Sequence, residues 1–391
     1  MRITLGFERI IALLAALGNP EKDLRVVQVV GTNGKGTTAV AFAAALEELG
    51  ESTGAYLSPH VLSYTERVML RGRYVTEVEF AAGMDKAIKA ADENDIDASQ
   101  FELLTAGALA MFRDAGFSFA VVEAGLGARH DATSAAEPEA VVLTNVSRDH
   151  TEYLGETVEE IAREKLASLS AGTRLILGDA SILEIAREEC RRRGARLVEA
   201  FDDEPGELAP GVAPYAARNV RLGVRAAESV VGRTLNEETL TRVLRKVRGV
   251  LPGRFEVREL GGVPVVVDGG HNPAGVRAAV AAVRSVYGER PLWVVFGALR
   301  GKDIASMLTA LTREAERLLL TCAENERALD PEYVLSEHEP RDRGGRRARV
   351  MQDADIALSV AADEARLRDG VVLVTGSLYL GARVLGRLRE E

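Results

Sequence analysis

The sequence is poor in aromatic residues and in cysteine, and it has no long hydrophobic run. Aromatic side chains make up 5% of the 391 residues and include one tryptophan, so a nucleic-acid surface built on base stacking does not fit this composition. The two cysteines, Cys190 and Cys322, lack metal-site spacing, and two thiols so far apart do not indicate a disulfide framework. The apolar stretch 39–46 is far too short to span a bilayer.

Acidic residues outnumber basic residues, and the formal net charge is −10. An acidic protein repels polyanions at long range, so we expect neither nucleic acid nor a membrane as a partner. A phosphate group would have to be bound locally, by backbone N–H groups and a few well-placed cations. The N-terminus carries an early acid, Glu8, and no apolar core, so it does not predict a signal peptide. We therefore expect a cytoplasmic protein.

Apolar runs alternate with amphipathic segments along most of the chain, which predicts an α/β fold with mainly parallel sheets. Helices are expected at 37–49, 157–169 and 237–247, and a domain boundary near Leu251–Gly253. The length fits two or three domains, and the segment 201–214, rich in acids, proline and glycine, is typical of a loop or linker. The expected strands are 25–30, 54–57, 119–122 and 140–144 in the first half, and 264–267, 292–296 and 371–374 in the second.

The sharpest local signal is a glycine-rich segment, 29–38, between an apolar strand and an alanine-rich helix. Glycines let a backbone turn tightly around an anion, and the N-terminus of the helix adds partial positive charge. Lys35 supplies a cation for the terminal phosphates and Thr37 a hydroxyl for Mg²⁺. An extra Gly36 separates these two residues, unlike the common phosphate loop. The plain alternative is a turn that only connects strand and helix, but the combination of residues at this junction favours phosphate binding.

Polar residues follow the expected strands, where ligands of an open parallel sheet bind. Glu123 after an apolar strand resembles an acid that holds magnesium; the alternative is a solvated acid. The second half repeats this pattern, and we expect it to contribute to a cleft because it has no phosphate loop of its own. The remaining polar segments at strand ends are Ser58–His60, Asn145–His150, Asp268–Asn272 and Thr375–Tyr379.

Taken in order, these segments resemble the folylpolyglutamate synthase/dihydrofolate synthase family of the muramyl-ligase superfamily. The resemblance covers nearly the whole chain. The third segment departs from the family pattern at Ala128 and Ser134, where Gly and Asn are usual. The matching segments are 31–37, 58–60 with 66–68, 123–133, 149–155, 162–165, 251–254, 268–273 and 375–379.

The resemblance implies an ATP-binding muramyl-ligase-type domain with a phosphate loop over 1–252 and a smaller, Rossmann-like glutamate-ligase domain over 253–391. It implies an ATP- and Mg²⁺-dependent ligase that joins L-glutamate to dihydropteroate or a reduced folate through an acyl phosphate, acting as a monomer on small molecules. The implied catalytic residues are Lys35, Lys165 and His271. The implied nucleotide contacts are Thr32, Asn33, Gly34, Lys35, Gly36, Thr37, Asn219, Arg254 and Asp268. The implied magnesium contacts are Thr37, Ser58, Glu123, His150 and a carbamylated Lys165, and the implied substrate contacts are Arg67, Asp131, Thr133 and Ser377.

Two alternatives remain open from the sequence. A cell-wall muramyl ligase shares the fold and the chemistry, but it would depend on a uridine nucleotide. A non-catalytic paralogue could bind nucleotide or pterin without turnover, and the altered third segment and a stretch before Asn219 that is shorter than in typical members allow for that.

Overall fold

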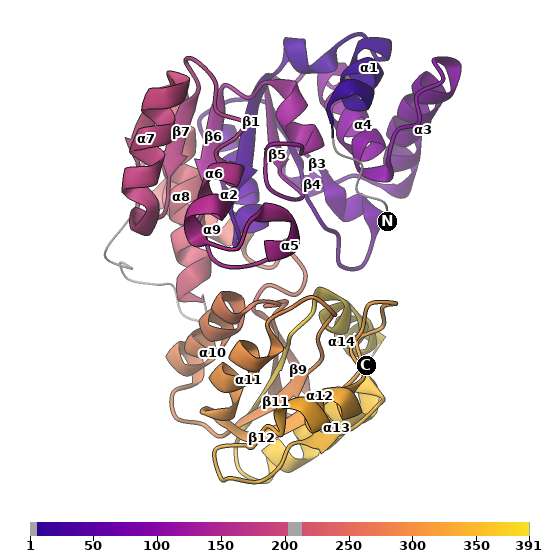
Figure 1. The fold of residues 1–391 in the computed structure, drawn as a ribbon, viewed down its shortest axis with the longest axis vertical. Helices are drawn as coiled ribbons and strands as arrows, with labels where there is room; N and C mark the ends of the chain where they lie inside the picture. Colours follow the sequence, from indigo (N-terminus) through magenta and orange to yellow (C-terminus); the bar gives the residue numbers. More distant parts are fainter. Residues whose placement is uncertain (1–5, 202–212, 391) are drawn as a thin grey trace. The chain divides into compact units, whose positions relative to one another are not determined.

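The computed structural model describes residues 6–201 and 213–390. The chain forms two compact units, the first Met1–Pro205 with Ala216–Arg248 and the second Gly206–Tyr215 with Gly249–Glu391. Figure 1 shows that each unit is a sheet flanked by helices. The units divide close to the predicted boundary at Leu251–Gly253, and most of the predicted 201–214 linker lies outside the described residues.

The first unit is built on an eight-stranded sheet. Its order is β4 (Arg73–Tyr74), β3 (Val68–Leu70), β2 (Thr53–Tyr56), β5 (Phe119–Glu123), β1 (Arg25–Val30), β6 (Ala140–Leu143), β7 (Arg174–Leu177) and β8 (Arg196–Glu199). In this order the six strands β2, β5, β1, β6, β7 and β8 are parallel to one another. At one edge, β3 pairs antiparallel with β2, and β4 pairs antiparallel with β3. The central strands are buried, apart from Arg25 at the start of β1, as expected for a parallel sheet with helices on both faces.

Two layers of helices cover this sheet. The helices of the first unit are α1 (Glu8–Ala16), α2 (Lys35–Glu48), α3 (Glu77–Glu93), α4 (Gln100–Asp114), α5 (Thr151–Leu154), α6 (Val158–Lys165), α7 (Leu183–Arg193), most of α8 (Pro214–Val231) and α9 (Glu237–Val247). Helices α1, α3 and α4 bury one apolar cluster with the sheet, which includes Ile10, Leu109 and Phe112. Helix α2 packs with α9, and Gly223 of α8 lies against Phe42 of α2 with no room for a side chain.

The expected strands are confirmed to within a residue at each end, but the helix predicted over 157–169 ends earlier. Helix α6 stops at Lys165, and the chain continues in turns in which Leu166 and Leu169 are both buried. Apolar residues in a turn satisfy the same periodicity as a further helical turn, which explains the overestimate. None of the helices within the described residues has both the length and the apolar character that crossing a bilayer needs.

The second unit has a six-stranded sheet. Its order is β13 (Arg349–Val350), β12 (Ala315–Leu320), β11 (Leu292–Phe296), β14 (Val371–Thr375), β10 (Val263–Val267) and β9 (Glu256–Leu260). All neighbours are parallel except β9, which pairs antiparallel with β10. The helices are α10 (Pro273–Tyr287), α11 (Ile304–Thr312), α12 (Pro331–His338), α13 (Ala354–Arg366) and α14 (Leu378–Glu390). This doubly wound arrangement confirms the Rossmann-like prediction.

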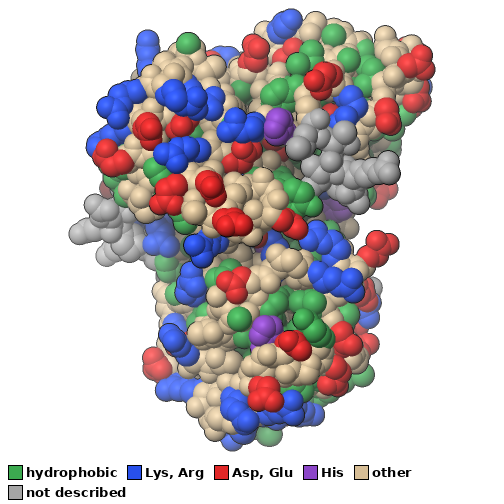
Figure 2. Space-filling view, viewed as in Figure 1, with side chains coloured by type: hydrophobic (Ala, Val, Ile, Leu, Met, Phe, Trp, Pro, Cys, Tyr) green, Lys and Arg blue, Asp and Glu red, His purple; other side chains and the backbone are tan. Residues whose placement is uncertain are grey.

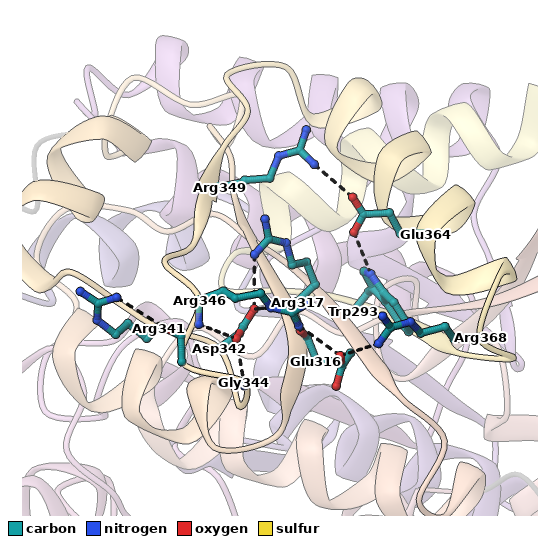
Figure 3. Close-up of polar contacts among 11 residues, drawn as sticks. Trp293, Glu316, Arg317, Arg341, Asp342, Gly344, Arg346, Arg349, Glu364 and Arg368 are labelled. Atoms are coloured by element: carbon teal, nitrogen blue, oxygen red, sulfur yellow. Dashed lines mark hydrogen bonds and ion pairs between the residues drawn. The ribbon is translucent and has the colours of Figure 1, made fainter.

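An ion-pair network closes the outer edge of the second sheet (Figure 3). The buried Asp342 carboxylate accepts hydrogen bonds from Arg346 Nε at 2.9 Å and from Arg317 Nη1 at 3.4 Å. Glu316 pairs with Arg346 and with Arg368 at the same edge. The edge strand β13 is only two residues long, and charged flanks of this kind keep an open edge from pairing with another chain. On the face shown in Figure 2, acidic and basic side chains are interspersed.

Candidate active site

The phosphate loop connects β1 to α2, as predicted. Helix α2 begins at Lys35 behind an N-cap, Gly34, whose φ of 82° is left-handed. Gly31 has a φ of 148°, and a Cβ atom there would lie 1.9 Å from Thr144 Oγ1. A Cβ atom at Gly34 would lie 2.3 Å from Asn219 Nδ2, so the predicted nucleotide contact Asn219 does pack against the loop. Both glycines are therefore required by close approach as well as by backbone conformation.

The loop is held in shape by the segment that follows β6. Asn33 N–H donates to Asn145 Oδ1 at 3.1 Å, and Asn145 Nδ2 donates back to Asn33 O at 2.8 Å. Thr144 Oγ1 also donates to Asn33 O at 2.8 Å, and Thr32 N–H donates to Asn145 O at 2.9 Å. Sequence reasoning did not assign a role to Thr144 or Asn145; their place at the end of the strand next to β1 was the available signal.

The parallel register places the predicted polar residues of the first unit at one sheet edge. Val29 lies opposite Glu123, and Tyr56 lies opposite Val122, so the ends of β1, β2 and β5 coincide. Glu123 is 5% exposed, and its Oε2 accepts a hydrogen bond from Ser58 N–H at 2.9 Å. Thr37 is buried in the first turn of α2. A carboxylate and hydroxyls are hard oxygen donors, so this donor set fits Mg²⁺.

Lys165 is the most unusual ionisable group of this edge. Its side chain is 4% exposed, and Nζ donates to Gly31 O of the phosphate loop at 2.9 Å. Burial, and next to it the positive charge of Lys35, lower the pKa of Lys165 from 10.5 to about 7, against the opposing effect of Asp149. Lys165 is therefore not a solvent-exposed surface lysine, and its lowered pKa leaves a larger neutral fraction at neutral pH than an exposed lysine has.

The loop that follows β5, residues 124–136, is organised around the buried Asp131. Its Oδ2 accepts from Gly125 N–H at 2.8 Å and Leu126 N–H at 2.9 Å. Its Oδ1 accepts from Thr133 N–H at 3.0 Å and Thr133 Oγ1 at 2.5 Å. Burial raises the pKa of Asp131, and these four hydrogen bonds oppose the rise. Asp131 and Thr133 therefore shape the loop, and direct contact of either with a substrate stays a prediction.

Arg67 and His150 lie in the loops after β2 and β6. Arg67 is buried at the end of a short 3₁₀ helix (Tyr64–Arg67), and its Nε donates to His60 Nδ1 at 2.8 Å. Burial lowers the pKa of His60, and the adjacent guanidinium lowers it further, so His60 acts as a neutral acceptor. His150 has a left-handed backbone (φ 51°) directly before α5, and its N–H donates to Asp149 Oδ1 at 2.9 Å.

Asp268 is the centre of the polar residues in the second unit. It follows β10, its Oδ1 accepts from Gly270 N–H at 2.9 Å, and its Oδ2 accepts from Phe255 N–H at 3.0 Å and from the Tyr215 hydroxyl. Burial raises the pKa of Asp268, while the Tyr215 hydrogen bond and the charge of Arg254 oppose the rise. Sequence reasoning missed Tyr215, because nothing local links it to a carboxylate 53 positions later.

The other residues predicted for the second unit lie beside Asp268 or after β14. His271 Nδ1 is 3.0 Å from Gly269 O. The place where a side chain at Gly269 would lie is 2.7 Å from Arg254 Nη1. Ser377 is 1% exposed, and its hydroxyl accepts from Tyr379 N–H at 3.1 Å in the first turn of α14. Since β10 and β14 are parallel neighbours, these groups gather at one edge of the second sheet.

Comparison with known proteins agrees with this arrangement of two α/β units, one with a phosphate loop. The family model of the Mur ligase middle domain matches residues 29–209, and that of the Mur ligase glutamate ligase domain matches residues 253–378. These matches define the class as Mur ligases.

Individual relatives narrow the class. The chain is 36% identical over 412 residues to a probable bifunctional folylpolyglutamate synthase/dihydropteroate synthase of Haloferax volcanii; the match covers 96% of this chain but only 48% of that protein, so this chain spans about half its length. It is 30% identical over 398 residues to the dihydrofolate synthase/folylpolyglutamate synthase of Escherichia coli, covering 98% and 91% of the two chains.

A solved structure agrees with both. The crystal structure of a bifunctional folylpolyglutamate synthase/dihydrofolate synthase from Yersinia pestis, complexed with AMPPNP and a Mn ion, superposes with a TM-score of 0.86 at 28% identity, covering 100% of this chain and 95% of that one. The chain belongs to the folylpolyglutamate synthase/dihydrofolate synthase family of ATP-dependent ligases.

Proposed function

We propose that this chain adds L-glutamate to the carboxylate of dihydropteroate, of a reduced folate, or of both, with hydrolysis of ATP to ADP and phosphate. The observation that carries the proposal is the shared edge of the first sheet. There the phosphate loop, the buried Lys165 amine on Gly31 O, and the 124–136 loop organised by Asp131 meet at the ends of neighbouring strands. The names of the relatives given above specify folate-class substrates, and this supports the same class of acceptor for this chain.

The chemistry requires that two anions, a carboxylate and a triphosphate, be brought together. The carboxylate attacks the γ-phosphorus and forms an acyl phosphate with release of ADP; the amine of glutamate then attacks the acyl carbon, and phosphate leaves. Lys35 and the free N–H groups at the start of α2 lower the repulsion by holding the β- and γ-phosphates. Thr32, Asn33 and Gly36 supply the remaining loop contacts, and Asn219 lies against Gly34.

Magnesium would be held by Thr37 and Glu123, with Ser58, His150 and a carbamylated Lys165 as further contacts. When bound, it supplies positive charge at the phosphate oxygens. The hydrogen bond from Ser58 N–H to Glu123 Oε2 holds one carboxylate oxygen in place and so orients the whole carboxylate group.

In the second unit, Arg254 and Asp268 would contact the nucleotide and His271 the reacting groups. Asp268 already accepts from Gly270 and Phe255, so its orientation is set before any ligand binds. Arg67 and Ser377 are assigned to the substrates. We accordingly assign residues 1–252 to ATP binding and 253–391 to glutamate ligation.

Release of ADP by the purified chain tests the proposal. ATP, Mg²⁺ and glutamate are supplied with dihydropteroate in one reaction and with a reduced folate monoglutamate in another. Turnover in both identifies a bifunctional enzyme, and turnover with the folate alone identifies a dedicated polyglutamate synthase. We expect turnover in both, because the sequence retains Asp131, Ala132 and Thr133.

A third reaction with a uridine-nucleotide-linked muramyl acceptor tests the cell-wall alternative. ADP release in that reaction alone would overturn the folate assignment. Absence of ADP release in all three, together with measurable nucleotide binding, would identify a non-catalytic paralogue. We further expect the chain to act as a cytoplasmic monomer, and light scattering of the purified protein measures the mass.

A further inference from the structure

Gln28 interrupts the otherwise apolar interior of β1, and it does so shortly before the phosphate loop. The residue is 0% exposed, and its neighbours Val27, Val29 and Val30 are equally buried. Across the sheet it lies opposite Val122 of β5. A buried primary amide carries two donors and an acceptor that all need partners, so a polar side chain at this place calls for an explanation.

The amide group of Gln28 is bonded to the 124–136 loop. Its Nε2 donates to Thr133 Oγ1 at 2.7 Å and to Ser134 Oγ at 2.7 Å. Both hydroxyls use their own protons elsewhere: Thr133 Oγ1 donates to Asp131 Oδ1 at 2.5 Å, and Ser134 Oγ donates to Ala128 O at 2.7 Å. Each hydroxyl can therefore only accept from residue 28, and the orientation of the Gln28 amide is fixed by its surroundings.

That orientation has a cost. With Nε2 turned to the two hydroxyls, Gln28 Oε1 is buried and has no hydrogen-bond partner among the described residues. An unsatisfied buried acceptor destabilises the folded state, and an apolar residue of similar size would avoid this cost. A role in stability alone is therefore a poor account of Gln28, whereas a role in fixing the loop explains why the two donors are needed.

The fixed loop ties two parts of the site together. Thr133 and Ser134 lie in the short 3₁₀ helix that Asp131 caps, and Asp131 also orders the amides of Gly125 and Leu126. Ser134 stands where the family pattern has a longer side chain, and Gln28 reaches its hydroxyl from the strand that carries the phosphate loop.

We propose that Gln28 is a positioning residue that locks the 124–136 loop to the phosphate-loop strand and so sets where the acceptor carboxylate lies relative to the γ-phosphate. The inference rests on the proposed function for its kinetic consequence, but its structural consequence can be measured without turnover.

The test compares Gln28→Met, which keeps the length and apolar bulk but has no donor, with Gln28→Glu, which keeps the shape and replaces the donors by an acceptor. Ser134→Ala removes one of the two acceptors and serves as the milder variant if a substitution at position 28 prevents folding. Thr53→Val is the matched control, because Thr53 is a buried polar residue at the first position of β2, and among the described residues its hydroxyl bonds to the adjacent Gly54 O alone.

The kinetic result expected for both Gln28 variants is an increase of about tenfold in the KM of the folate-class acceptor, with the KM of ATP changed by less than about twofold. Ser134→Ala should add little on the Gln28→Met background, because both changes break the same contact. Thr53→Val should leave both KM values unchanged. An equal rise in both KM values, or full additivity of the two substitutions, would overturn the positioning role.

Hydrogen exchange supplies the readout that does not depend on activity. In Gln28→Met, the amides of Gly125, Leu126 and Thr133 should exchange faster by about tenfold, while those of β1 and β5 keep their rates. If the wild-type chain turns over no folate acceptor, the proposed function fails, and exchange alone decides the role of Gln28. Wild-type exchange in the 124–136 loop of both Gln28 variants would refute the inference.

Discussion

Replacing Lys165 with alanine should abolish ligation, and added formate or acetate should restore part of it. The prediction follows from the proposed carbamate on Lys165, which is an anion on a long stem that binds a hard cation through oxygen. A small carboxylate can enter the space vacated by the side chain and present the same oxygens. The carbamate nitrogen keeps one N–H, so the donor of the hydrogen bond to Gly31 O is retained after the modification.

The structure sets the size of the effect that makes carbamylation feasible. Carbon dioxide adds only to a neutral amine. At pH 7 a lysine with a pKa of 10.5 is neutral in about 0.03% of molecules, whereas one with a pKa of about 7 is neutral in about half, an increase on the order of 10³-fold. Since burial lowers the pKa of Lys165, carbamylation should become more extensive as pH rises from about 6 to 8, and it should reverse when carbon dioxide is removed below pH 6.

The assay is ADP release with and without small carboxylates, at constant ionic strength. Lys86→Ala is the matched control, because Lys86 is an exposed lysine paired with Asp114 at 2.6 Å, and its loss should change neither activity nor the response to formate. Mass spectrometry under carbon dioxide should detect the added mass on wild-type protein and on Lys86→Ala, but not on Lys165→Ala. Full activity of Lys165→Ala, with no response to carboxylates, would refute the modified-lysine reasoning.

Three further substitutions probe the nucleotide site. Lys35→Ala should lower kcat by about 10²–10³-fold while the melting temperature stays unchanged, because a half-buried side chain at a loop contributes little to folding; near-normal turnover would end the phosphate-loop assignment. Asn145→Ala removes the two hydrogen bonds to Asn33 and should raise the KM of ATP by about 10–100-fold, as measured by initial rates. Arg254→Met should raise the KM of ATP, whereas Arg258→Met on the exposed strand β9 should not, and equal effects of the two would count against a nucleotide contact at Arg254.

Much of the fold follows from hydrophobic runs. Strands such as Arg25–Val30 and Leu292–Phe296 were predictable because a parallel strand buried on both faces is apolar along most of its length. The β3–β4 hairpin was not predicted, since short edge strands carry no such signal. The end of α6 at Lys165 was missed because the turn that follows it buries leucines at helical spacing.

The site was predictable where chemistry is carried by short segments and not where it depends on distant partners. The phosphate loop and Glu123 were proposed from their places along the chain, and Lys165 from the family resemblance. Gln28 offered a signal, a lone polar residue in an apolar strand, but its bonds to a loop about a hundred positions later belong to the tertiary fold. Tyr215 offered none.

Because Asn33 is hydrogen-bonded to Asn145, the conformation of the phosphate loop depends on a second segment of the chain. The Asn33 N–H is held by a side chain 112 positions away, so the glycine-rich segment alone does not determine the conformation of the loop. If residues 31–37 were transferred to another strand–helix junction, the nucleotide contacts would be kept but the hydrogen bonds from Asn145 would be lost. The nucleotide would then have to order the loop on binding, which would lower its affinity. Conversely, changes after β6 can retune nucleotide affinity without altering any residue of the loop itself.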